Sequence, residues 1–202
     1  MTKVDFKKQL KHLYIASAKE PVIIDVPAMN FLMIDGIGDP NTSKEYMESV
    51  EALFSASYTL KFKIKKEQKV DYGVLPLEGL WWADDVADFA KGNKDKWKWT
   101  SMIMQPEYVT EELVKEAVEK VKKKKELPGL VKMRFEQFTE GKAAQIMHIG
   151  SYAKEGPTIE KLHSFVKALG LTLRDKHHEI YLGDPRRSAP EKLKTVIRHP
   201  VK

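Results

Sequence analysis

The apolar residues near the start of the chain indicate a strand followed by a helix. Residues 31–34 form a compact apolar run that Gly36 and Gly38 end, which predicts a buried strand. Thr42 and Glu45 then have the spacing of a capping box, so a helix is predicted to begin at Thr42. The helical period of three and four residues is carried by Met47, Val50, Leu53, Phe54 and Tyr58. The alternation in "YTLKFKIKK" leaves the end of this helix open.

Strand patterns return in the middle of the chain. The segment "VDYGVLPLEGLWW" predicts a second strand, interrupted by a proline and a glycine, and residues 97–104 predict a third. Residues 83–96 between them are polar and predict a loop, with one helical turn as the alternative. A connecting helix is predicted over residues 110–126 with Thr110 as its N-cap. Its apolar stripe consists of Leu113, Val114, Ala117, Val118 and Val121.

The last third of the chain places strands around another helix. "VKMRFEQFTEGKAAQIMHIG" predicts a hairpin with Gly141 in its turn. A helix is predicted to start near Pro157 and to stop at Gly170. Its apolar face consists of Ile159, Leu162, Phe165, Val166 and Leu169. Strands are predicted for "EIYL" and for residues 193–198.

The two halves of the chain have the same order of elements, strand-helix-strand-strand, if "YGVL" is the second strand of the first half. This order predicts an α+β fold made of two pseudo-symmetric repeats, at about residues 28–105 and about residues 131–200. The helices are expected to cover one face of each sheet. The remaining faces are expected to meet around a central ligand cleft, since pockets form where modules meet. Residues 1–27 are predicted to be a leader segment before a single domain over residues 28–202.

Composition narrows the class of protein. The 202 residues are 42% hydrophobic and 32% charged, which is typical of a globular domain. There is no cysteine, which excludes disulfides, thiol nucleophiles and cysteine zinc sites, and we expect a cytoplasmic protein. No apolar run approaches the roughly 20 residues that cross a bilayer. The net charge is +6, and the basic run at residues 122–125 is either a solvated helix end or a nucleic-acid patch.

The strand "EIYL" carries the main candidate chemistry. Side chains alternate along a strand, so Glu179 and Tyr181 share one face if Ile180 and Leu182 face a core. A partly desolvated Glu179 can attract a cationic ligand or act as a general base, and Tyr181 can donate to a ligand carbonyl. The plainer alternative is an ion pair between Glu179 and Arg198 on the neighbouring strand.

Further candidate ligand contacts are aromatic, thioether, acidic or imidazole side chains on the predicted strands. They are Tyr72, Glu78, Trp81, Trp82, Met102, Met104 and His148. Adjacent tryptophans cannot both point inward on a regular strand, so one of Trp81 and Trp82 is expected at the rim of the cleft. For the tryptophans and methionines, the alternative to ligand contact is packing in the core. For Glu78 the alternative is a position on the surface. For His148 it is a hydrogen bond within the protein. The histidine spacings predict no metal site, and no cofactor is predicted.

Three motifs resemble those of the GyrI-like small-molecule-binding family. They are "PLEGLWW" at residues 76–82, "QIMHIGSYAKEGPTIEKLHSFV" at residues 145–166 and "HEIYLGDPRRSAPEKLKTVIRHP" at residues 178–200. The resemblance covers residues 20–200 and extends to the effector-binding domains of MerR- and AraC-type multidrug regulators. It implies two repeats around a cleft that holds an acidic residue, at Glu179, for cationic aromatic drugs.

The resemblance also implies two functions. Stand-alone family members hydrolyse cyclopropane-bearing compounds that alkylate DNA, so we expect a detoxifying hydrolase of such compounds with Glu179 and Tyr181 as catalytic residues. The alternative is a non-catalytic module that sequesters drugs or contacts a protein partner, as a gyrase inhibitor does. Either way the expected partner is a small hydrophobic or cationic aromatic molecule, with no membrane and no specific nucleic acid. Residues 1–27 are too short for a helix-turn-helix unit with its own core.

Overall fold

The computed structural model describes residues 1–85 and 92–202, so part of the predicted loop at 83–96 lies outside the described residues. The chain divides into two compact units. The first unit consists of Met1–Gln9, Met29–Leu77 and Trp81–Phe138. The second unit consists of Leu10–Ala28, Glu78–Leu80 and Thr139–Lys202. Residues 1–27, predicted to be a leader, thus contribute to both units.

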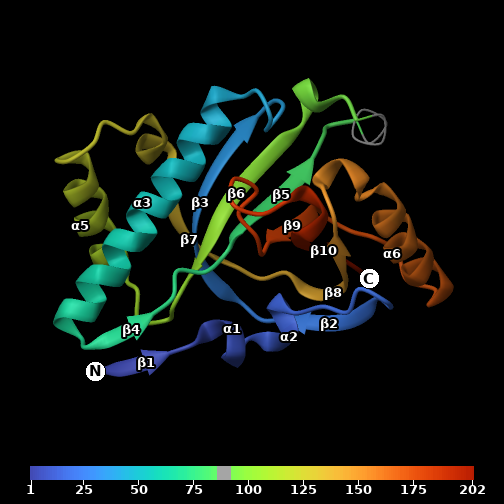
Figure 1. Ribbon diagram of the computed structural model, residues 1–202, viewed down its shortest axis with the longest axis horizontal. Helices are drawn as coiled ribbons and strands as arrows, with labels where there is room; N and C mark the ends of the chain where they lie inside the picture. The colour runs from blue at the N-terminus through green and yellow to red at the C-terminus, as the bar shows by residue number, and fades with distance from the viewer. Residues whose placement is uncertain (86–91) are drawn as a thin grey trace. The chain divides into compact units, whose positions relative to one another are not determined.

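The first unit is a sheet with two helices on it. Its strand order is β5-β6-β3-β7, and β3 pairs antiparallel with both β6 and β7. The strands are β3 (Met29–Ile37), β5 (Leu77–Trp82), β6 (Lys98–Gln105) and β7 (Arg134–Phe138). Helix α3 (Lys44–Glu67) lies along β3 and β6, and α5 (Glu111–Lys122) packs against α3 (Figure 1). The first unit also contains a separate pair of parallel strands and a short helix. These are β1 (Thr2–Val4), β4 (Val70–Tyr72) and α1 (Phe6–Gln9).

Helix α3 differs from its prediction at both ends. Its N-cap is Ser43, whose hydroxyl accepts a hydrogen bond of 3.2 Å from the Tyr46 N–H, so the prediction of Thr42 as the cap is wrong. The helix runs to Glu67 through the segment that alternates in sequence. Leu60 and Ile64 explain this extension, because they continue the buried stripe at helical spacing. The N-cap predicted for α5 is confirmed, since the Thr110 hydroxyl accepts from the Leu113 N–H.

Two strand predictions need correction. The second strand of the first half is β5, Leu77–Trp82, and not "YGVL", because β4 ends at Tyr72 and Pro76 has no N–H to donate to a ladder. The predicted hairpin around Gly141 does not form either. Its two runs are strands, but β7 pairs with β3, and β8 pairs with β10 and β2. Gly141 does take a positive φ of 71°, so it redirects the chain without closing a hairpin.

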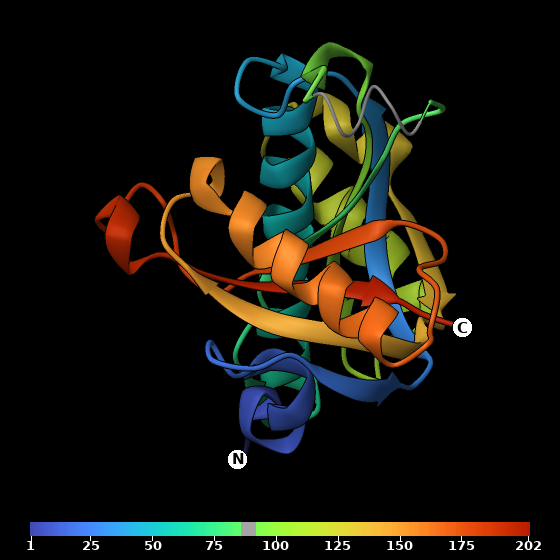
Figure 2. The same cartoon turned by 90° about the vertical axis from the view of Figure 1, so that its right-hand side faces the viewer.

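The second unit has the strand order β2-β8-β10-β9, followed by the Glu78–Leu80 part of β5. Its strands are β2 (Val22–Val26), β8 (Gly141–Ile149), β9 (His177–Tyr181) and β10 (Lys194–Pro200). Helix α6 (Gly156–Ala168) packs on β8, and the short α2 (Lys11–Tyr14) contacts β2 (Figure 2). The predicted start of α6 near Pro157 and its stop at Gly170, with φ of 70°, are confirmed.

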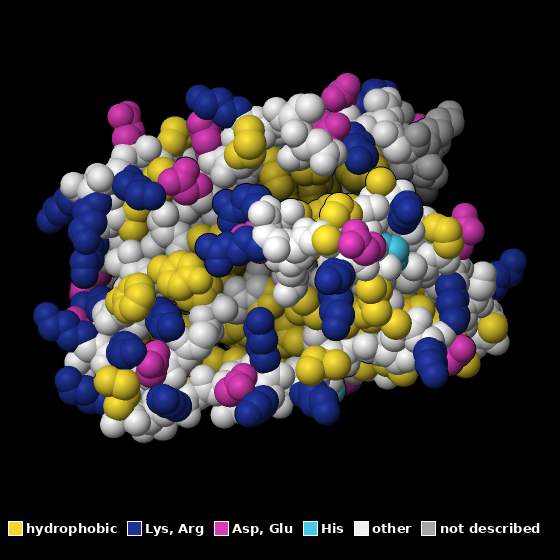
Figure 3. All heavy atoms as spheres, in the orientation of Figure 1, with side chains coloured by type: hydrophobic (Ala, Val, Ile, Leu, Met, Phe, Trp, Pro, Cys, Tyr) yellow, Lys and Arg dark blue, Asp and Glu magenta, His cyan; other side chains and the backbone are white. Residues whose placement is uncertain are grey.

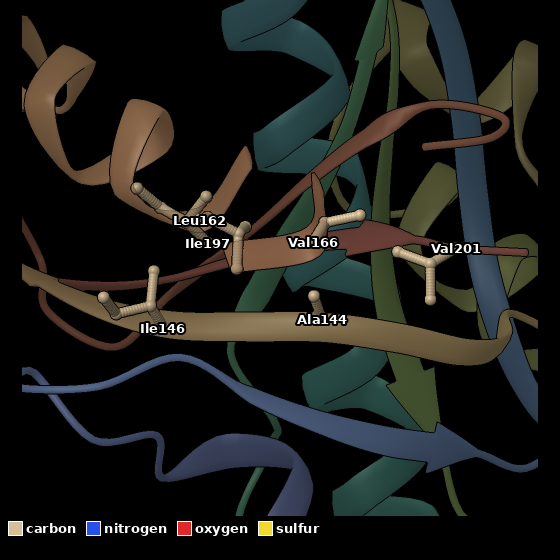
Figure 4. Close-up of a cluster of buried hydrophobic side chains, with 6 residues drawn as sticks. All are labelled: Ala144, Ile146, Leu162, Val166, Ile197 and Val201. Carbon is tan, nitrogen blue, oxygen red and sulfur yellow. The ribbon is translucent and has the colours of Figure 1, made fainter. Parts of the chain in front are cut away.

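The core of the second unit forms between α6 and its sheet. Figure 4 shows the inward side chains of the helix meeting those of β8 and β10. The cluster consists of Ala144, Ile146, Leu162, Val166, Ile197 and Val201, each at most 2% exposed. This packing occupies one face of β8 and β10 with aliphatic groups. Glu179 of β9 lies opposite Ile197 in the ladder, so its side chain is on the same face of the sheet as this core.

Both units share one topology. The strand-helix-strand-strand order is β3-α3-β5-β6 in the first unit and β8-α6-β9-β10 in the second, with β4 inserted in the first. In each repeat the last strand lies between the other two in the sheet. β6 lies between β5 and β3, and β10 lies between β9 and β8. An additional strand then flanks the first one, β7 beside β3 and β2 beside β8. The predicted α+β fold with two pseudo-symmetric repeats is confirmed, and the ligand cleft stays a prediction.

The surface carries mixed charge. On the face shown in Figure 3, lysine and arginine side chains are spread widely and interspersed with aspartate and glutamate. The four-residue basic run at 122–125 sits at the C-terminal end of α5, where Lys122 pairs with Glu119 at 2.8 Å. Within residues 1–85 and 92–202, no helix has the length and apolar character required to cross a bilayer.

Candidate functional site

Strand β9 places Glu179 and Tyr181 on one face, as predicted. Ile180 between them is fully buried, and β10 runs alongside with Ile197 opposite Glu179 and Thr195 opposite Tyr181. His177 shares the face of Glu179, because it lies two residues earlier on the same strand. Three polar side chains therefore stand in a row on one side of a five-residue strand.

The row is joined by hydrogen bonds on both carboxylate oxygens of Glu179. The Tyr181 hydroxyl donates to Oε2 at 2.8 Å, and Nε2 of His177 lies 3.0 Å from Oε1. The Glu179 side chain is 15% exposed, so it is mostly buried but still reaches the surface. A carboxylate offers about four acceptor positions, which leaves room for water or a ligand. The predicted alternative, an ion pair with Arg198, is wrong, because Arg198 is directed to Glu140 instead.

Two residues that the sequence did not single out complete the site. Glu155, at the N-cap of α6, is 5% exposed and shares a hydrogen bond with the Glu179 carboxylate. The Tyr152 ring meets the Tyr181 ring edge to face, with centroids 5.5 Å apart. Both come from "GSYAKEG", a stretch inside a motif that resembled the family, so the motif held the only signal for them. We define the carboxylate site as Tyr152, Glu155, His177, Glu179 and Tyr181.

Electrostatics hold Glu179 in its ionised form. Burial alone would raise the pKa of Glu179, but the hydrogen bonds from His177 and Tyr181, and charge attraction by His177, outweigh it and lower that pKa. For Tyr152, burial and the nearby Glu155 and Glu179 raise the pKa to about 12. The site thus combines an ionised carboxylate with a neutral phenol, Tyr152, at neutral pH. An ionised carboxylate can act as a general base, and the neighbouring phenol can donate a hydrogen bond.

A cluster of imidazoles adjoins the carboxylate site. The His177 ring lies 5.9 Å from the ring of His199, which in turn lies 5.5 Å from that of His163. Burial lowers the pKa of His199 to about 3 and also lowers that of His163, helped by the neighbouring imidazoles. His199 and His163 are therefore neutral at physiological pH. Among the described residues, no group of three or more histidine or acidic side chains is arranged to hold a metal ion.

Glu78 belongs to a separate buried ion network in the second unit. Its Oε1 accepts from the Tyr14 hydroxyl at 2.8 Å, and its Oε2 lies 3.0 Å from Nε2 of His178. The other ring nitrogen of His178 faces Glu140 at 3.0 Å, and Arg198 donates to Glu140 at 3.0 Å. Each of these ionic side chains is 1% exposed. Both oxygens of Glu78 are thus occupied by protein groups, which favours a structural role.

The pKa values of this ion network keep its charges balanced. Burial opposes the charged form of His178, but Glu140 and Glu78 outweigh it and raise the pKa of His178 to about 9. Burial likewise opposes ionisation of Glu140, but His178 and Arg198 lower its pKa to about 2. Two cations and two carboxylates therefore neutralise one another inside the second unit.

The remaining predicted contacts lie elsewhere. His148 bonds to the Thr158 hydroxyl at 2.9 Å and to the Ser151 carbonyl at 3.2 Å, which matches its plainer alternative. The others belong to the first unit. There Trp81 is 4% exposed and packs on Tyr46 and Trp97, whereas Trp82 is only partly buried. Met102 and Met104 are buried, and Tyr72 packs on Phe6. Ligand contact by Tyr72, Trp81, Trp82, Met102 and Met104 stays a prediction.

Comparison of the sequence with models of known protein families identifies the family of this chain. The model of the "GyrI-like small molecule binding domain" matches residues 19–202. The chain belongs to the GyrI-like family. The resemblance drawn from the three motifs is thereby confirmed. A comparison with curated proteins finds no match.

Solved structures agree with this GyrI-like assignment. A conserved protein of Listeria innocua is 40% identical over 98% of this chain and 100% of its own, with a TM-score of 0.89. A hydrolase from Listeria innocua is 39% identical, with the same coverage and a TM-score of 0.86. The C-terminal domain of EcmrR is 12% identical over 91% of this chain and 97% of its own, with a TM-score of 0.57, which shows likeness of fold alone.

Proposed function

We propose that this GyrI-like protein binds flat hydrophobic or cationic aromatic compounds and adds water to electrophilic ones that carry a strained cyclopropane ring. The observation that carries the proposal is the mostly buried Glu179 carboxylate, whose pKa is lowered, beside the hydroxyl of Tyr181. The similar protein from Listeria innocua that is described as a hydrolase supports a hydrolytic reaction. The carboxylate site lies entirely within the second unit.

The proposed reaction is a redox-neutral hydration. The oxygen of a water molecule bonds to a cyclopropane carbon while one ring carbon–carbon bond breaks. The electron pair of that bond moves into the conjugated carbonyl, which becomes an enolate or phenolate. Glu179 accepts the proton that the water loses. The new oxyanion takes a proton, and the product is the substrate plus one water.

Glu155 is the proposed source of the second proton. Two carboxyl groups joined by a hydrogen bond hold one proton between them, because both cannot ionise at close range. We propose that the shared proton resides on Glu155, because a hydrogen bond from Glu155 lowers the pKa of Glu179 and so favours its ionised form. Glu155 can then donate it while Glu179 accepts one, and the pair returns to its starting state by passing a proton from Glu179 to Glu155.

The tyrosine pair provides the proposed binding surface. Tyr152 is 37% exposed, and its ring stands edge to face with that of Tyr181. An exposed aromatic ring gains from contact with a flat aromatic guest, or with a cation over its face. The negative charge on Glu179 adds attraction for a cationic guest. This combination supports both parts of the expected ligand class.

A non-catalytic binder is the second candidate. The observation that favours it is the hydrogen bonding on both oxygens of Glu179, because donors that stabilise a carboxylate also make it a weaker base. Such a site would capture a cationic aromatic compound and release it unchanged. The two candidates share a site and differ only in turnover.

Incubation with a cyclopropane-bearing dienone alkylator tests the proposal. We expect the purified protein to convert it to the ring-opened alcohol, one water heavier, faster than buffer does, as followed by mass spectrometry. The matched ligand is the same compound with the cyclopropane replaced by a gem-dimethyl group, which should bind without reacting. Saturable binding of both compounds with no product above buffer would contradict hydrolysis and support the binder.

A further inference from the structure

Helix α3 carries a row of aromatic side chains on its outer face. Phe54, Tyr58 and Phe62 follow one another at intervals of four residues, so they line up along one side of the helix. Tyr58 is 46% exposed and Phe62 is 58% exposed, whereas Phe54 is partly buried. We call these three residues the aromatic row. Figure 3 shows hydrophobic side chains gathered over α3, and exposed apolar surface of this kind marks an interaction site.

The rings of the aromatic row already rest on one another. The centroid of the Tyr58 ring lies 6.4 Å from that of Phe54 and 6.4 Å from that of Phe62, and the ring planes are inclined by 30° and 27°. The Lys61 ammonium lies 5.6 Å from the centroid of the Phe62 ring, as a cation–π contact. Side chains that are held in this way lose little further freedom when a partner covers them, which lowers the entropic cost of association.

The side chains on this face of α3 are arranged symmetrically about Tyr58. Phe54 and Phe62 lie four residues before and after it, and Glu51 and Lys65 lie seven residues before and after it. Four and seven residues are close to one and two turns of a helix, so all five side chains project to the same side. The stretch is therefore apolar in the middle, acidic at its N-terminal end and basic at its C-terminal end.

We infer that α3 pairs antiparallel with the α3 of a second copy of this chain, around a two-fold axis at Tyr58. Reversing the direction of the second helix places Phe54 opposite Phe62 of the second copy, and Glu51 opposite Lys65 of that copy. Such an interface is self-complementary, because the two-fold axis makes each contact occur twice. In a parallel pair each residue would lie opposite its own copy, which would set like charges together at Glu51 and at Lys65.

The charges around the aromatic row can accommodate this pairing. Lys61 and Lys65 both pair with Asp71, at 3.7 Å and 2.7 Å, so two positive charges share one carboxylate. Glu51 pairs with Lys125 of its own chain at 3.1 Å, but both of these side chains are more than half exposed. Exposed ion pairs contribute little to stability, so Glu51 can exchange Lys125 for a lysine of the second copy at small cost.

The area of the aromatic row sets the expected strength of the dimer. Tyr58 and Phe62 are each about half exposed, and a fully covered aromatic side chain buries about 150–250 Å², so each of them offers roughly 100 Å². Together with the polar residues around them, the two copies would bury less than about 1,200 Å², which is the range of weak and transient interfaces. We therefore expect a reversible dimer that forms as the protein concentration rises.

Sedimentation equilibrium of the full-length protein over a series of concentrations tests this inference. We expect the apparent mass to rise from 23.2 kDa towards twice that value. Tyr58→Glu sets two like charges at the axis, so this variant should stay at 23.2 kDa at every concentration, with unchanged thermal melting. A wild-type protein that stays monomeric would overturn the inference. It would leave the proposed hydrolysis untouched, because α3 belongs to the first unit and Glu179 to the second.

Cysteine cross-linking tests the antiparallel direction. The chain has no cysteine, so Tyr58→Cys introduces a single thiol at the axis, and oxidation should join two copies there. Met47→Cys is the matched control, because Met47 is 57% exposed on the same helix. It lies 11 residues from the axis, so its two copies should be about 33 Å apart and should not be joined. Equal cross-linking of the two variants would overturn the inference, since a parallel pair brings both positions together.

Charge reversal tests the two ion pairs of the dimer. Glu51→Lys and Lys65→Glu, each studied alone, should weaken the dimer at least about tenfold, because each change sets like charges together at two places. An equal mixture of the two variants should regain the wild-type affinity, since in the mixed dimer each acidic residue again lies opposite a basic one. A mixture that associates no more tightly than either variant alone would overturn this pairing of α3.

Discussion

Replacing Glu179 with glutamine is expected to lower kcat/KM for the cyclopropane substrate by about 10²–10⁴-fold, the usual contribution of a general base. Glutamine keeps the shape of the side chain and can still accept from Tyr181, but it cannot take a proton from water. The apparent affinity for a neutral substrate should change little, because the lost step follows binding. Affinity for a cationic substrate should also fall, since the site loses its negative charge. Steady-state kinetics with both substrate types measure these effects.

Matched variants make this result specific. Glu160→Gln changes an exposed glutamate of α6 in the same unit and should leave the rate within about twofold, since most surface substitutions cost under about 0.5 kcal/mol.

Glu155→Gln should keep a hydrogen bond to Glu179 but slow the reaction above pH 7, where solvent supplies few protons. Because the pKa of Glu179 is lowered, activity should decline only as the pH falls below the ordinary value of 4.5. A Glu179→Gln protein with the wild-type rate would refute the catalytic role.

Replacing Glu140 with glutamine is expected to destabilise the protein by about 3–5 kcal/mol, as breaking a buried ion pair does. Glu140 is the carboxylate that joins His178 to Arg198 inside the second unit, and its removal leaves excess positive charge away from water. Urea unfolding measures the loss. Glu136→Gln is the matched control: Glu136 also pairs with an arginine, Arg134, at 2.7 Å, but its side chain is 55% exposed. That control should cost at most about 1 kcal/mol. Equal losses in the two variants would contradict the buried network.

The same ion network predicts how stability depends on pH. The raised pKa of His178 means that its contribution is complete below the unfolded value of 6.5 and is lost as the pH rises through about 9. The lowered pKa of Glu140 means that its contribution is complete above 4.5 and is lost as the pH falls toward about 2. Stability from this pair should therefore be greatest between about pH 4.5 and 6.5. Glu140→Gln should flatten the acidic decline, and a wild-type protein with no decline above pH 7 would contradict the charge on His178.

The alternation of side chains along a strand was enough to predict the geometry of Glu179 and Tyr181. The apolar side chain of Ile180 between them is fully buried on one face of the sheet. Glu179 and Tyr181, its neighbours along the strand, therefore point to the opposite face. The same rule separates His177 from His178 and explains why one joins the carboxylate site and the other the ion network. Local periodicity also placed α5, α6 and the strands around them.

What the sequence could not provide was pairing over long separations. The links Tyr14–Glu78 and Glu78–His178 join residues 64 and 100 positions apart, so no local pattern marks them. The mistaken hairpin at Gly141 has the same cause, because strand partners are chosen by the sheet and not by proximity along the chain. Glu155 was missed because it looks like an ordinary residue before a helix. Only tertiary structure brings it to Glu179.

Glu179 is proposed to activate water for attack on the ligand. A single turnover in H₂¹⁸O, with enzyme in excess over the cyclopropane substrate, tests it most directly by mass spectrometry of the alcohol. We expect the first turnover to place one ¹⁸O in the product, because the attacking oxygen comes from solvent. Product that carries ¹⁶O from that first turnover would contradict it, since the oxygen would then have come from the carboxylate of the protein.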